Sequence, residues 1–428
     1  MDIKTKSLPG LYLSSLHRNS TDLVVLKLAF RHNLANTPEN NLLLALYGDL
    51  LLAGTNRKDR STLTNTLNEA GIDITISSGE GVTNLTLTVL KSELKTALSL
   101  LREIMLEPAF KETEVKRAKT TLKNNLDLAK DNAKQIAHDL LRRELFKVGS
   151  PTYGYLPENY EPLVDKTKRS ALLKLHDTIL TSEYIVTVGG DANNIAVLEK
   201  LVNELRERVS LHPNNQLTEN LPLEIKQTKL VAREIASKQN LELSIGASVP
   251  LRLDDTDYCA FLFGLHVLGH WGGFAGRLMS TVREKEGLTY GIYAKLEAIN
   301  LQRTGYWRVM TFFAPKDVKR GIASTRREIK AIAEKGITES EWKRFHNIIR
   351  TSEALIEDTF TGQVNLAHGN ALAGLSPDAY RELKHRLKNV KRAEVNQALK
   401  KYLRPEQLVI CLTGPTKAIP GGVAKLLK

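Results

Sequence analysis

The side chains that could hold a catalytic metal are few and poorly spaced. His266 and His270 lie four residues apart, so they could share one face of a helix. The apolar residues around His266 and the Trp-Gly-Gly after His270 instead favour a core or loop role. His138 and Glu144 are six apart and share no helical face. Neither HExxH nor HxxEH occurs. We therefore expect no catalytic metal in this chain.

Arg283 and Tyr290 stand seven residues apart in the segment VREKEGLTY (Val282–Tyr290). A guanidinium and a phenol both donate hydrogen bonds to a peptide carbonyl, so together they could stabilise an oxyanion. The plainer interpretation is that Arg283 caps a helix end and pairs with Glu284 or Glu286, while Tyr290 is an ordinary strand aromatic. Taken alone, the residues favour the plainer interpretation.

A glycine-rich loop precedes this segment and contains Gly269, Trp271, Gly272, Gly273 and Gly276. Glycine allows close backbone approach, so the loop could contact a substrate or act as a gate. A simple packing turn is the alternative. Phosphate binding is disfavoured, because no Walker lysine follows. Trp271 could anchor a peptide side chain or seal a domain interface.

The elements that must position these residues occur twice along the chain. The strand-like run LVVLKLAF (Leu23–Phe30) is echoed by LELSIGASV (Leu241–Val249). Likewise TEVKRAK (Thr113–Lys119) is echoed by SEWKRFH (Ser340–His346). Further pairs follow in the same order at an offset of roughly 216 to 227 residues. The chain is therefore predicted to be an internal duplication.

Each half reads as strand, helix, helix, strands, two long helices, then a helix and a final strand. Period-2 runs predict half-buried strands, and long 3.6-period segments predict helices that cover them. We therefore expect an α+β fold with two homologous domains, each an antiparallel-rich sheet covered by helices. The expected domains are residues 1–211 and 227–428, joined by a polar linker at 212–226.

Composition excludes several classes of function. The 428 residues carry a net charge of +13, but Lys and Arg are mixed with acidic residues and no nucleic-acid motif is present. We therefore expect that the chain does not bind nucleic acid and that its partner is less basic than the chain itself. No apolar run predicts a membrane span. Cys259 and Cys411 form no disulfide framework. Without a secretory signal the expected location is cytoplasmic; a periplasmic location would follow if a signal had been removed.

The segment GGFAGRLMSTVREKEGLTYGIYA (Gly272–Ala294) resembles the pitrilysin/insulinase peptidases of family M16, which include the mitochondrial processing peptidase. The runs FKVGSPTYGYLPENYEPL and ILTSEYIVTVGGDAN fit the same family. The resemblance covers essentially the whole chain. It implies two domains of the LuxS/MPP-like metallohydrolase type.

The zinc motif of that family is missing. Catalytic members place HxxEH on the first apolar helix, just before Gly-Thr. Here the matching segment is ALYGDLLLAGT. It puts Ala45 and Asp49 at the positions of the two histidines, and Gly48 at the position of the glutamate base. Asn124 or Asn125 stands where the third ligand, a glutamate, is expected. A methyl, a hydrogen and one carboxylate cannot complete a zinc site.

The resemblance therefore implies a non-catalytic subunit of a heterodimeric zinc peptidase. Arg283 and Tyr290 match the pair that the second half contributes to substrate, and the glycine-rich loop would bind peptide. A partner subunit would supply zinc and base, and the substrate would be a peptide or unfolded polypeptide. The run GIDITISSGEGVTNL matches the substrate-pairing edge strand, but Ile74-Thr75 replaces the usual Asn-Ala. The alternatives are an inert scaffold and a peptide-binding pseudo-peptidase.

Overall fold

The computed structural model describes residues 3–207, 219–270 and 275–427. It divides into two compact units. Unit 1 comprises Met1–Leu126, Asn159–Thr218 and Glu353–Tyr380, and unit 2 comprises Asp127–Glu158, Glu219–Ser352 and Arg381–Lys428. Each half of the sequence therefore contributes to both units. The chain passes from one unit to the other within four helices: α4 (Glu112–Lys130), α6 (Pro157–Val164), α11 (Glu339–Asp358) and α13 (Pro377–Asn389).

Unit 1 is built on a six-stranded sheet with the order β1-β2-β6-β3-β5-β4. Its strands are β1 (Ile3–Leu8), β2 (Leu11–His17), β3 (Leu23–Arg31), β4 (Asp73–Gly79), β5 (Val82–Leu90) and β6 (Glu183–Gly190). The β2–β6 pair is parallel and the other pairs are antiparallel. The sheet is thus antiparallel-rich, as predicted.

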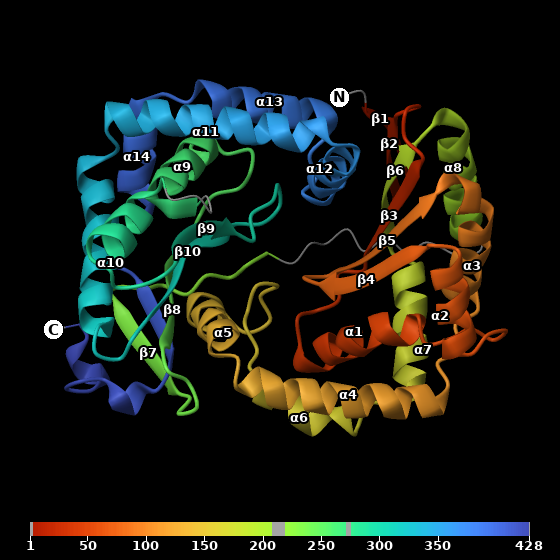
Figure 1. The fold of residues 1–428 in the computed structure, drawn as a ribbon, viewed down its shortest axis with the longest axis horizontal. Helices are drawn as coiled ribbons and strands as arrows, with labels where there is room; N and C mark the ends of the chain where they lie inside the picture. Colours follow the sequence, from red (N-terminus) through yellow and green to blue (C-terminus); the bar gives the residue numbers. More distant parts are fainter. Residues whose placement is uncertain (1–2, 208–218, 271–274, 428) are drawn as a thin grey trace. The chain divides into compact units, whose positions relative to one another are not determined.

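Helices cover both faces of this sheet (Figure 1). The unit 1 helices are α1 (Pro38–Leu51), α2 (Arg60–Glu69), α3 (Leu94–Leu106), α7 (Arg169–Leu180), α8 (Ala192–Glu207) and α12 (Phe360–Leu372). Leu26 and Leu28 of β3 join the core formed with α1, α3, α7 and α8. Val25 and Ala29 point the other way and pack against α12. This alternation follows from the period of two along a strand.

Unit 2 repeats the design with a five-stranded sheet of order β7-β11-β8-β10-β9. Its strands are β7 (Lys229–Glu234), β8 (Leu241–Val249), β9 (Ile292–Glu297), β10 (Gly305–Phe313) and β11 (Val409–Gly414). Its helices are α5 (Ala133–Leu145), α9 (Tyr258–Leu265), α10 (Val318–Lys335) and α14 (Arg392–Tyr402). One face joins α9, α10 and α14 in a large apolar core, and α5 covers the other face at β8 and β11.

The two halves of the sequence exchange one helix each. Helix α5 follows α4 in the first half but packs on the second sheet, and α12 follows α11 in the second half but packs on the first sheet. At the α12 contact Gly189 leaves no room for a side chain, because a Cβ there would lie 2.7 Å from Val364. At the α5 contact Thr413 Oγ1 donates a hydrogen bond to the carbonyl of Ala133 at 2.6 Å.

The predicted duplication and α+β class are confirmed. Arg283 lies on a short π-helical stretch, Met279–Lys285. The next strand begins only at Ile292, so Tyr290, a strand aromatic in the plainer interpretation, lies in the bend before that strand. Part of the predicted linker, residues 212–218, lies outside the described residues, and the predicted domain boundary stays a prediction.

Candidate functional site

Helix α1 carries the positions that the resemblance assigns to zinc ligands and base. Ala45 and Asp49 are exposed on it. Gly48 lies beside Ile76 of β4, where an added Cβ would meet the Ile76 side chain at 3.5 Å. A Cβ at position 48 would therefore make only ordinary van der Waals contact, so the backbone there does not require glycine.

The single carboxylate at these positions already has a cationic partner. Arg60 Nη1 and Nη2 each lie 3.1 Å from an oxygen of Asp49, and Arg60 Nε lies 2.7 Å from Glu114 Oε2 on α4. The hydrogen bond to Asp49 is the main cause of a raised pKa for Arg60. Bidentate guanidinium–carboxylate pairs of this kind are strong and geometrically specific. A metal ion would have to displace a fixed positive charge to reach Asp49.

The third predicted ligand position offers no better donor. Asn124 and Asn125 are both exposed on α4. Within the described ranges, no group of three or more His, Cys, Asp or Glu side chains gathers in a way that could hold a metal ion. Zinc sites need three or four such ligands. The described residues therefore show no replacement for the missing site.

Arg283 and Tyr290 lie against each other. The Arg283 Cζ is 4.4 Å from the centroid of the Tyr290 ring, which is cation–π geometry. Arg283 is on the π-helical stretch Met279–Lys285, and the Tyr290 side chain is 76% exposed. Glu286, one alternative partner considered for Arg283, is bonded to Arg327 of α10. The pair therefore presents a phenol and a guanidinium together on one turn.

The backbone conformation and backbone hydrogen bonds fix the turn between Arg283 and Tyr290. Gly287 has φ +61°, a conformation that side chains disfavour. Its N–H donates to Arg283 O at 3.0 Å, and the N–H of Leu288 donates to Val282 O at 3.0 Å. The Leu288 side chain is buried in the unit 2 core. These contacts hold positions 283 and 290 in one arrangement before any ligand binds.

The glycine-rich loop is only partly within the described residues. Gly269 has φ +153°, and a Cβ at Gly276 would lie 2.8 Å from the Gly269 Cα, so the two backbones are in close contact. Trp271, Gly272 and Gly273, predicted to bind peptide, lie outside the described residues. The contact gives Gly269 and Gly276 a packing role whatever else they do.

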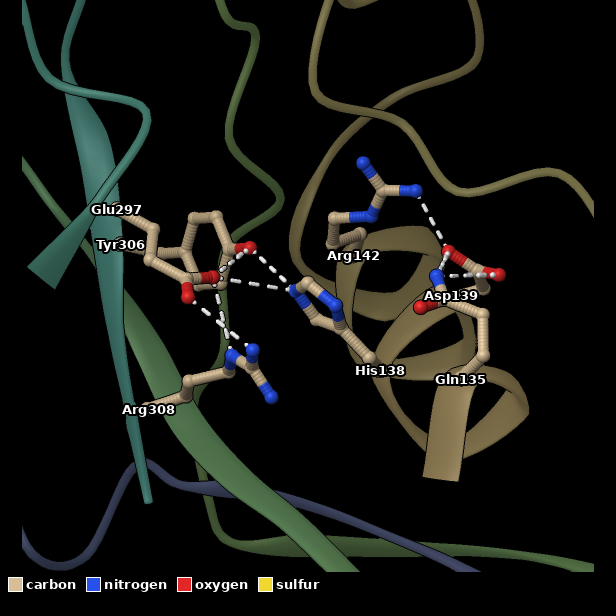
Figure 2. Close-up of polar contacts among 7 residues, drawn as sticks. All are labelled: Gln135, His138, Asp139, Arg142, Glu297, Tyr306 and Arg308. Atoms are coloured by element: carbon tan, nitrogen blue, oxygen red, sulfur yellow. Dashed lines mark hydrogen bonds and ion pairs between the residues drawn. The ribbon is translucent and has the colours of Figure 1, made fainter. Parts of the chain in front are cut away.

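A second polar cluster in unit 2 was not predicted (Figure 2). Glu297 of β9 accepts hydrogen bonds from Tyr306 Oη at 2.6 Å and from Arg308 Nε and Nη2 at 3.0 and 3.1 Å. His138 of α5 places Nε2 2.6 Å from Tyr306 Oη and 3.2 Å from Glu297 Oε2. On the same helix Asp139 accepts from Gln135 and Arg142. This cluster ties the exchanged helix α5 to the second sheet.

Electrostatics within the cluster keep its charges fixed near neutral pH. Burial works to raise the pKa of Glu297, but hydrogen bonds from His138, Arg308 and Tyr306 outweigh burial and hold that pKa well below its usual range. Burial is the main cause of a lowered pKa for His138. A carboxylate that accepts several hydrogen bonds stays ionised, and a buried imidazole stays neutral.

A sequence signal for this cluster did exist. Tyr306 and Arg308 are two apart on β10 and so point to one face, and Glu297 is the cross-strand neighbour of Tyr306. No local pattern, however, marks His138 as their partner, because it lies 168 residues from Tyr306 along the chain.

Two family models match this chain. Residues 38–154 match the model described as insulinase (peptidase family M16), and residues 166–349 match the one described as peptidase M16 inactive domain. The "non-peptidase homolog YmxG" of Helicobacter pylori is 22% identical over 394 residues, covering 91% of this chain and 88% of the relative. The "uncharacterized zinc protease YmxG" of Bacillus subtilis is 23% identical over 261 residues, covering 60% of this chain and 61% of the relative.

Solved structures share the fold. A structure described as a peptidase M16 inactive domain from Pseudomonas fluorescens superposes with a TM-score of 0.85 at 20% identity, covering 98% of this chain and all of that one. A structure described as a protease from Helicobacter pylori gives 0.82 at 13% identity, covering 96% and 99%. This chain has the duplicated α+β fold of these structures, and its sequence contains no HxxEH. The chain belongs to peptidase family M16, as a member without the zinc motif.

Proposed function

We propose that this chain is the non-catalytic subunit of a two-chain M16 zinc peptidase. In this proposal a partner chain supplies zinc and general base, and this chain contributes Arg283 and Tyr290 to peptide bound there. The observation that carries the proposal is the contact between the half-buried guanidinium of Arg283 and the exposed phenol of Tyr290, at a turn that backbone hydrogen bonds fix. At the same time Ala45, Gly48 and an Asp49 held by Arg60 stand at the ligand positions.

The chemistry assigned to the pair is hydrogen-bond donation. As a substrate carbonyl becomes an oxyanion, a guanidinium and a phenol that are already positioned stabilise the new charge without reorganising. Loss of one such donor raises the barrier by about 2.7–4 kcal/mol, which lowers kcat by two to three orders of magnitude. The substrate class is a peptide or an unfolded polypeptide, and the zinc belongs to the partner.

The experiment is co-expression with an M16 chain that has an intact HxxEH, followed by an assay on a quenched peptide library. Arg283→Ala and Tyr290→Phe are expected to lower kcat by about a hundredfold or more without preventing assembly. Lys285→Ala, an exposed residue of the same turn, is the matched control because it removes a charge without touching the pair. The isolated chain is expected to be inactive.

Other outcomes of this experiment would contradict the proposal or favour one of the alternative functions. If no complex forms, or if the complex cuts equally well with both substitutions, the residue roles assigned here are wrong. An inert scaffold would assemble and leave cleavage unchanged by either substitution. A peptide-binding pseudo-peptidase would hold peptide in the absence of any zinc-bearing partner.

A further inference from the structure

A basic cleft lies between α4 and α7 in unit 1. Its volume is about 770 Å³. Five cationic side chains line it: Lys116, Lys119, Lys123, Lys168 and Arg169. The only carboxylates among its lining residues are Glu112 and Asp165. The lining therefore carries an excess of three positive charges.

Part of this charge is engaged within the cleft. Lys123 Nζ lies 2.7 Å from Asp165 Oδ1, and Lys119 Nζ donates to the Asp165 carbonyl at 3.0 Å. The hydrogen bond from Lys123 is the main cause of a lowered pKa for Asp165. Arg169 donates to the carbonyls of Phe110 and Ala109, so its charge is positioned but not neutralised.

Lys116 and Lys168 remain exposed, and neither has an acidic partner in the described parts of the chain. Lys116 is on α4 and Lys168 is the residue just before α7, yet both line the same cleft. Like charges held together raise the free energy of the folded chain. An anionic partner would remove that cost, and a concave wall would strengthen its attraction by focusing the field.

The spacing of the lysines favours a polypeptide over a small ion. Lys116, Lys119 and Lys123 lie three and four residues apart, so they form a stripe along one face of α4. The α4 wall from Glu112 to Lys123 is about 17 Å long at 1.5 Å per residue. On a helix of a partner protein, carboxylates three and four residues apart would repeat at the same interval as these lysines. The length also matches about five residues of extended chain.

We propose that this cleft binds an acidic segment of a partner polypeptide, in which several Glu or Asp side chains meet the lysines of α4 and α7. The inference does not depend on the function proposed above, because it needs neither zinc nor the turn at Arg283. Lys168 and Lys116 are the contacts that the partner carboxylates would take first.

The test uses the full chain and a fluorescently labelled peptide of about 12 residues with Glu at helical i, i+3 and i+4 positions. Binding is followed by anisotropy at low and physiological salt. We expect saturable binding that Lys116→Gln/Lys168→Gln weakens about tenfold or more, since each variant residue removes a charge-assisted hydrogen bond. Lys319→Gln/Lys400→Gln removes the same net charge from exposed positions of α10 and α14 and should change the affinity by less than about twofold.

Three results would overturn the inference. One is absence of saturable binding, and another is equal weakening in both double variants, which would mean attraction by overall charge. The third is binding of inorganic tripolyphosphate at the cleft with no binding of the acidic peptide, which would make it a small-ion site. Circular dichroism of both double variants, expected to match the wild type, ensures that lost binding does not reflect lost folding.

Discussion

Glu297→Gln should release the exchanged helix α5 from the second sheet. The substitution keeps the side-chain shape but removes the charge that Arg308 and His138 contact (Figure 2). It also leaves Arg308, whose side chain is 9% exposed, without its counter-charge. Breaking a buried ion pair by removing one partner costs about 3–5 kcal/mol. We take about 3 kcal/mol, because Glu297 itself is 22% exposed and water screens part of the effect.

The assay is native-state hydrogen exchange, because a chain with two compact units need not unfold in one step. A loss of about 3 kcal/mol corresponds to exchange of the α5 amides about a hundredfold faster. Glu284→Gln is the matched control, since Glu284 is an exposed glutamate of the same unit outside the cluster. If α5 exchanges at the same rate in both variants, the cluster does not hold the helix and the reasoning is refuted.

The remaining predictions concern pH, packing and metal. Burial lowers the pKa of His368 to about 4, below its unfolded value of 6.5, so the folded state resists protonation. Protonation of this imidazole should therefore lower the free energy of unfolding by about 3 kcal/mol as pH drops from 6.5 through 4, and His368→Gln should make that part of a pH–stability curve less steep by this amount. Gly246→Ala should lower Tm strongly, because its Cβ would lie 2.2 Å from a backbone oxygen of β10, whereas Gly369→Ala has free space and should raise Tm slightly. Neither zinc nor a chelator should shift Tm, because Arg60 holds Asp49; a zinc-dependent rise would show that the ligand assignment is wrong.

Local patterns were enough to predict most strands. The strand-like run Leu23–Phe30 predicted β3, but not that both faces of this strand would be buried. The first apolar helix was also expected, and Thr37 and Pro38 explain where it starts, since the Thr37 hydroxyl accepts a bond from the third residue of the turn. These features depend on neighbours in sequence, which is why they could be predicted.

Features that depend on distant residues were missed. The repeat shows that α5 and α12 correspond, but nothing in either segment says which sheet it covers. The π-helical stretch at Met279–Lys285 depends on a shifted backbone hydrogen-bond register, such as Glu286 N to Thr281 O, which apolar spacing does not encode. The Arg283–Tyr290 contact was suggested by the motif, but the positive φ of Gly287 that permits it was not.

No described helix is both long and apolar enough to cross a bilayer.

The helix exchange sets the order in which this protein can mature during synthesis. Strand β11, which pairs with β8 and receives α5, is synthesised long after that helix. Ala133 of α5 precedes its hydrogen-bond partner Thr413 by 280 residues, so α5 must wait for that length of synthesis before its binding face is complete. The first sheet waits as well, because α12 that covers it begins only at Phe360. Once β6 has been made, the first sheet has all six strands but lacks its covering helix α12, and α5 has no second sheet to cover. Neither unit is then finished, which exposes this chain to chaperones for longer than a protein whose domains close one after the other.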